Sequence, residues 1–95
     1  MADATMLALV KVSLQITTTA MDSYLSQLID SAMDAIKDEG ISLDLTRAVD
    51  RQLVIMYVNW LYLDRLSGDE MPRMLRYNLN NRLFKEAIEL GSSVN

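Results

Sequence analysis

The sequence contains no cysteine and no histidine. Without cysteine, the chain can form no disulfide, no thiolate metal site and no cysteine nucleophile. Without histidine, it can build neither a Ser-His-Asp triad nor a histidine-ligated zinc site. We therefore expect a protein that is not an enzyme and that holds no cofactor or metal ion.

Helix-breaking residues are also scarce, with three glycines and one proline among 95 residues. No run of residues has the alternation of a strand, and no segment is repeated. Apolar residues instead recur at helical spacing through most of the chain. The pattern predicts an all-α fold, a small bundle of about four helices in a single domain of residues 1–95, with a short frayed tail at 91–95. The predicted helices cover approximately residues 4–14, 20–38, 45–67 and 70–90.

Local signals mark the ends of the second helix and the start of the third. Thr19 and Asp22 resemble a capping box, in which the threonine oxygen accepts a hydrogen bond from the first turn. Gly40 fits the left-handed residue that follows a helix. Ser42 or Asp44 can cap the third helix.

The third helix contains the stretch "QLVIMYVNWLYLDR", in which Asn59 is the only clearly polar residue between Gln52 and Asp64. Twelve residues separate Arg51 from Asp64, whereas a membrane span needs about 20. We therefore expect a buried helix and no membrane span. We also expect no signal peptide, because Asp3 stands where such a segment has positive charge.

The inward faces of the last two helices can be read from spacing. The residues expected to face inward at the start of the third helix are Leu45, Ala48, Val49 and Leu53. Gly68 is expected to end that helix, and Asp69 can cap the next one. Pro72 is tolerated because it falls in the first helical turn. The inner stripe of the fourth helix is predicted to be Met71, Leu75, Leu79 and Leu83, flanked by Phe84 and Ile88.

Three aromatic residues lie within the apolar run. Tyr57 and Tyr62 are five residues apart, about 140° around a helix. They are not expected to face one small core together, so we predict that Tyr57, Trp60 or Tyr62 meets another subunit. Packing in the core is the alternative. Asn59 must bond either to a neighbouring helix or across a subunit contact, because an unpaired buried amide costs about 1–3 kcal/mol.

The two halves of the chain differ in charge. Residues 1–44 carry two basic and seven acidic residues, and residues 45–95 carry seven basic and six acidic residues. Asp30, Asp34 and Asp38 form an acidic stripe on the second helix, which we interpret as solvated or lumen-facing. The basic side chains Arg65, Arg73, Arg76 and Arg82 are candidates for ion pairs between subunits. The overall charge of −4 makes the chain a poor non-specific binder of nucleic acid.

The order of these segments resembles the small helical head–tail connector proteins of tailed bacteriophages, which are also called head-completion or DNA-packaging adaptor proteins. A short helix ends in "LQIT", an amphipathic helix "YLSQLIDSAMDAI" follows, then "VIMYVNWLYLDR", and "GDEMPRML" opens the last helix. The resemblance covers approximately residues 5–85.

The resemblance implies a structural virion protein of the head–tail interface, assembled in the host cytoplasm. Such a protein forms a ring, usually of about twelve copies. Its partners would be the portal protein and the next connector or tail-completion protein. DNA would pass through the channel without specific binding, and Asp30, Asp34 and Asp38 could line it. The alternative function is a small helical regulator that binds nucleic acid or one protein partner.

Overall fold

The computed structural model describes the backbone of residues 4–68 and 70–94, and the side chains of these residues except 65–67 and 90–94. The described residues form four α-helices and no strand. The helices are α1 (Ala4–Leu14), α2 (Asp22–Asp38), α3 (Ala48–Ser67) and α4 (Arg73–Val94). The predicted all-α fold of about four helices is confirmed.

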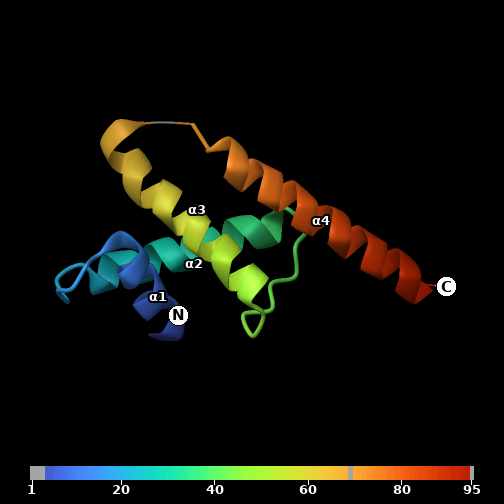
Figure 1. Cartoon of the computed structure of the whole chain (residues 1–95), viewed down its shortest axis with the longest axis horizontal. Coiled ribbons are helices and arrows are strands. Elements are labelled where there is room, and N and C mark those ends of the chain that lie inside the picture. Colours follow the sequence, from blue (N-terminus) through green and yellow to red (C-terminus); the bar gives the residue numbers. More distant parts are fainter. Residues whose placement is uncertain (1–3, 69, 95) are drawn as a thin grey trace.

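α3 is the central helix of the bundle (Figure 1). α1 and α2 pack against each other and both pack against α3, whereas α4 packs on α3 and extends away toward the C-terminus. The molecule measures 50 × 28 × 18 Å, and α1 and the C-terminal half of α4 lie toward opposite ends of its longest axis (Figure 1). No helix in the described part of the chain is both long and apolar enough to cross a membrane.

All four helices contribute side chains to one hydrophobic core. α2 supplies the most regular face, with a spacing of four, three and four residues between its buried members. Burying each large aliphatic side chain contributes about 1.5–3 kcal/mol. The buried apolar residues are Met6, Val10, Leu25, Ile29, Ala32, Ile36, Ile41, Leu53, Val54, Tyr57, Val58, Leu75 and Leu79.

Three helices end with a residue of positive φ. Gln15 has φ 59°, and the amides of Gln15 and Ile16 bond to the carbonyls of Val12 and Lys11, which is the Schellman arrangement. Gly40 follows α2 with φ 101°, and Gly68 follows α3 with φ 67°. The predicted roles of the two glycines are therefore confirmed.

The start of α2 differs from the prediction. The helix begins at Asp22, the N-cap position is Met21, and no side chain caps it. Thr19 takes part through its backbone carbonyl, which accepts a hydrogen bond from the Asp22 amide at 3.1 Å. The predicted capping box is wrong because the Asp22 carboxylate lies 2.7 Å from Nζ of Lys11, where it ties α2 to α1.

The start of α3 also differs. The helix begins at Ala48, and its N-cap, Arg47, makes no side-chain capping bond, so neither Ser42 nor Asp44 caps it. Asp44 instead holds the preceding turn, because its Oδ1 accepts hydrogen bonds from the amide and hydroxyl of Thr46 at 3.1 and 2.6 Å.

The first turns of α3 are rotated relative to the predicted face. Val49, expected inward, is 63% exposed, whereas Asp50 is 1% exposed. Ala48 is exposed as well, and Leu53 is buried as predicted. The physical reason is that Asp50 has a cationic partner on α4, so its carboxylate can be buried in place of an apolar side chain.

α4 follows Pro72, whose carbonyl accepts the first helical hydrogen bond, from the Arg76 amide at 3.1 Å. Leu75 and Leu79 are buried, and Met71 and Leu83 pack against the core, so the predicted inner stripe is confirmed. The helix runs to Val94. Gly91 therefore does not end it, and the frayed tail expected at 91–95 stays a prediction. Asp69, the predicted cap, lies outside the described residues.

Candidate functional site

Four large apolar side chains are exposed along the outer side of α4. Met74, Tyr77, Phe84 and Ile88 are 62%, 62%, 67% and 51% exposed. Asn81 lies in the same row and is exposed too. These five positions are separated by three, four, three and four residues, which is the spacing of a helix-packing seam. We call them the α4 outer stripe.

Sequence reasoning missed the α4 outer stripe because it placed Phe84 and Ile88 beside the inner stripe. The signal was nevertheless present. Positions 75, 79 and 83 form one row, and positions 74, 77, 81, 84 and 88 form a second row on the opposite side of the helix. A helix with two apolar rows has more apolar surface than a single core can cover.

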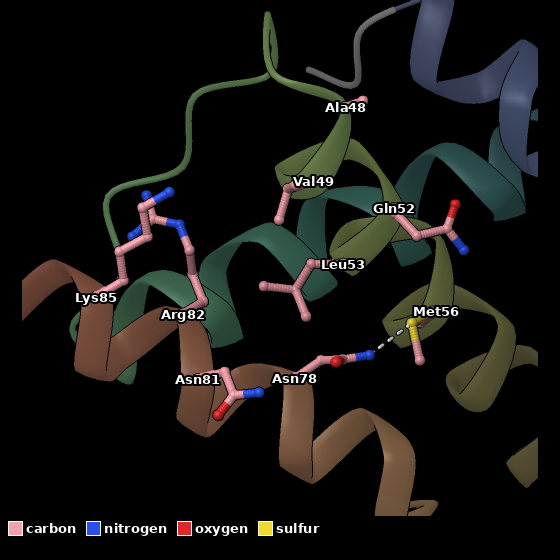
Figure 2. Close-up of a pocket in the computed structure, with 9 residues that line it drawn as sticks. All are labelled: Ala48, Val49, Gln52, Leu53, Met56, Asn78, Asn81, Arg82 and Lys85. Carbon is pink, nitrogen blue, oxygen red and sulfur yellow. Dashed lines mark hydrogen bonds between the residues drawn. The ribbon is translucent and has the colours of Figure 1, made fainter.

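A groove with a cavity volume of about 560 Å³ separates α3 from α4. Figure 2 shows the lining residues Val49, Gln52 and Leu53 on α3 and Asn81, Arg82 and Lys85 on α4. The Asn78 amide donates a hydrogen bond of 3.4 Å to Sδ of Met56 (Figure 2). The remaining lining residue is Ala48. The charged side chains of this lining, Arg82 and Lys85, are both basic.

A buried ionic network fixes α4 to α3 and to the loop before α3. Arg82 Nε lies 2.9 Å from Asp50 Oδ1, and Arg82 Nη1 lies 2.8 Å from Glu86 Oε2. Arg82 Nη2 donates a hydrogen bond of 2.7 Å to the Ser42 carbonyl. The Ser42 amide in turn donates a 3.1 Å hydrogen bond to Glu86 Oε1, which closes the network.

This network shifts the pKa values of two of its members, Arg82 and Glu86. The hydrogen bond to Asp50 is the main reason that the pKa of Arg82 is raised. The hydrogen bonds from Arg82 and Ser42 hold the pKa of Glu86 below its ordinary value. Arg82, which we had predicted at an interface, is 8% exposed and is engaged within its own chain.

The other predicted basic residues have different surroundings. Arg76 forms an ion pair with Glu39, which links α4 to the end of α2. Arg73 is exposed at the start of α4. The side chain of Arg65 lies outside the described part of the structure. Of the predicted basic residues with described side chains, Arg73 is therefore the most accessible to a partner.

The predicted aromatic residues contact their own chain. Tyr57 is 8% exposed, and its ring packs edge-on against Trp60 with centroids 5.5 Å apart. Burial raises the pKa of Tyr57. Tyr62 lies against Tyr24 of α2, with centroids 6.5 Å apart. Both tyrosines reach one core because the bundle covers α3 from more than one side. A subunit contact at these aromatic side chains stays a prediction.

Asn59, the polar residue of the apolar run, bonds to a neighbouring helix. Its Nδ2 donates a hydrogen bond of 2.8 Å to Oγ of Ser13 on α1. Beside it, a smaller hollow of about 270 Å³ lies between the end of α3 and the start of α4. Asn59 and Trp60 line this hollow, together with Asp64 and Glu70. The outer edge of Trp60 is therefore the part of the aromatic cluster that borders a recess.

The acidic stripe follows α2. Asp34 and Asp38 are exposed, and Asp30 is half-buried. In the described part of the chain, no group of three or more acidic side chains is arranged to hold a metal ion. The carboxylates thus give α2 a negative surface, and what that surface faces in an assembly stays a prediction.

Comparison with known proteins gives one family. A family model described as "Phage gp6-like head-tail connector protein" matches residues 4–80. No curated protein and no solved structure matches the chain. The matched range contains α1, α2, α3 and the first turns of α4.

Proposed function

Because the chain belongs to the phage gp6-like head–tail connector family, we propose that it is an adaptor subunit that assembles into a ring between the portal and the tail. The family places the chain among the structural connectors of the virion, proteins that contact other head and tail components. The ring, its position under the portal and its DNA channel are the parts that we propose.

The observation that carries the proposal is the family match over 4–80 together with the α4 outer stripe. A small domain that exposes a row of large apolar side chains needs another protein surface to cover them. A ring of identical subunits, about twelve by the resemblance, provides that cover by repeating one contact around an axis. No covalent chemistry is needed for such a role.

We propose that the acidic stripe on α2 lines the channel. A negative wall repels the DNA phosphates, so the duplex passes without binding. Asp34 and Asp38 are exposed on α2, as this role requires. The portal protein would bind one end of the ring, and the next connector or tail-completion protein would bind the other. Assembly would take place in the host cytoplasm, before the particle is complete.

Deletion of this gene from its phage tests the proposal. We expect capsids that lack tails, with tail attachment restored when the chain is supplied in trans. Antibody labelling of complete particles should mark the head–tail junction in electron micrographs. Tailed, infectious particles formed without this chain would refute the adaptor function.

Charge reversal tests the channel. Changing Asp34 and Asp38 to Lys in assembled particles should slow DNA passage, because cationic walls attract phosphates. The matched control changes Glu70 and Glu89 to Lys, two exposed acidic residues on or near α4. If both variants pass DNA at the same rate, the acidic stripe does not line the channel.

A further inference from the structure

The α4 outer stripe has the spacing that fits another helix lying along it. Its members Met74, Tyr77, Asn81, Phe84 and Ile88 follow the three-four alternation through which one helix packs lengthwise on another. The stripe from 74 to 88 is about 21 Å long at the ordinary helical rise. Leu75 and Leu79, on the other side of α4, are already buried in the core of the same chain.

A second row with the same spacing lies on the outer face of α1. Thr5, Ala8 and Val12 are exposed, Val12 by 76%, and they are separated by three and four residues. Met6 and Val10, on the inner side of α1, are fully buried. We call Thr5, Ala8 and Val12 the α1 outer face.

The two rows match residue by residue when the helices run parallel. With Thr5 beside Asn81, Ala8 falls beside Phe84, and Val12 falls beside Ile88. Each polar residue then meets a polar residue. The small Ala8 leaves room for the large Phe84, and facing positions of large and small side chains interdigitate well. An antiparallel arrangement keeps the spacing only with Val12, Ala8 and Thr5 beside Tyr77, Asn81 and Phe84. In that register, the polar residues no longer meet and Ala8 no longer faces Phe84.

The positions of the two rows suit a contact between copies. α1 and the C-terminal half of α4 lie toward opposite ends of the molecule (Figure 1). A contact between two different surfaces leaves one of each kind unused at the ends of a pair, so further copies can be added until a ring closes.

We propose that the α4 outer stripe of one copy packs parallel to the α1 outer face of the next copy, with Phe84 over Ala8. This contact rests on the proposed ring and specifies its subunit interface. Asn81 and Thr5 set the register, because one polar position within an apolar seam disfavours a shifted alignment.

Disulfide trapping tests the contact, and the chain is well suited to it because it contains no cysteine. Ala8→Cys and Phe84→Cys chains are made separately, mixed with portal protein, and oxidised gently. We expect a mixed disulfide dimer from the pair and little dimer from either chain alone. A chain carrying both substitutions should give a ladder of linked oligomers. The second pair, Val12→Cys with Ile88→Cys, should behave in the same way.

The matched control pairs Phe84→Cys with Ser23→Cys, an exposed position on α2. Equal yields from the control and from the Ala8 pair would overturn the proposal, as would efficient linking of Phe84→Cys chains to one another. If electron microscopy shows rings but neither pair gives a mixed disulfide, the proposed contact is wrong and the adaptor function still stands. A chain that stays monomeric with portal protein present would overturn both.

Discussion

Arg82 and Asp50 form a buried ion pair between α4 and α3, with Nε and Oδ1 2.9 Å apart. Their side chains are 7% and 1% exposed. Arg82 also lines the groove of Figure 2, so the pair joins the two helices beside that groove.

Removal of the arginine should destabilise the fold strongly. Arg82→Met leaves the Asp50 carboxylate buried without a cation, which should lower the free energy of unfolding by about 3–5 kcal/mol. The double variant Asp50→Leu with Arg82→Met should lose much less free energy of unfolding, because both charges are replaced by apolar groups. Urea denaturation followed by circular dichroism measures both. A loss below about 1 kcal/mol for Arg82→Met would contradict this role.

Stability should fall in acid, partly through Glu86. Hydrogen bonds from Arg82 and Ser42 lower its pKa in the folded chain below the ordinary value of 4.5. The unfolded chain therefore binds the proton more tightly. The contribution of Glu86 is complete above pH 4.5 and is lost as the pH falls through its folded pKa. Asp44 acts in the same direction, because hydrogen bonds from Thr46 lower its pKa.

Denaturation midpoints between pH 7 and pH 3 measure this effect. Glu86→Gln should reduce the loss of stability between pH 7 and pH 3. Glu89→Gln changes an exposed residue on the same helix and should leave that loss as in the parent chain. Equal slopes for the two variants would show that Glu86 is not responsible.

The two helix-ending glycines should differ in their tolerance of alanine. Gly40 has φ 101°, and a Cβ there would lie 3.3 Å from Cδ1 of Leu83. We expect Gly40→Ala to cost about 1–3 kcal/mol. Gly68 has φ 67° and no atom within 4 Å of an added Cβ, so Gly68→Ala should cost about 1 kcal/mol. Thermal unfolding measures the stability of both variants. A larger loss of stability for Gly68→Ala than for Gly40→Ala would contradict this prediction.

The hydrogen bond between Asn59 and Ser13 should appear as coupling between α3 and α1. Asn59→Ala and Ser13→Ala each remove one partner of the 2.8 Å bond. In a double-mutant cycle we expect an interaction energy of about 0.5–1.5 kcal/mol. Strictly additive losses would show that the bond adds nothing to stability.

Much of the fold could be predicted because its helices are regular. The repeat of Leu25, Ile29, Ala32 and Ile36 specifies the buried face of α2 without reference to any other element. Gly40 and Gly68 mark helix ends for a local steric reason. These features depend on neighbours within a few residues, so the sequence contains the information directly.

Two of the errors concern contacts between segments that are distant in sequence. Asp22 pairs with Lys11, and Asp50 pairs with Arg82, which is 32 residues away. Because of the first pair, Asp22 does not form the predicted capping box at the start of α2. Because of the second pair, Asp50 is buried on α3 where the local pattern predicted Val49. The exposed apolar row on α4 was missed for a different reason, because Phe84 and Ile88 were assigned to the side of the inner stripe although their spacing is a local feature of the sequence. In α3, Tyr57 is buried, Trp60 and Tyr62 are half-buried, and a contact of these residues with another subunit stays a prediction.

Arg82 lies close to the middle of α4, so its ion pair with Asp50 fixes the helix there. A tilt of α4 about this point would move its C-terminal end. Residues 82 to 94 span about 18 Å at the ordinary helical rise. Over that length, a tilt of about 10° at the pair moves the helix end by about 3 Å. In the proposed ring, a small adjustment at this salt bridge would therefore move the end of α4 while the core of the subunit stays in place.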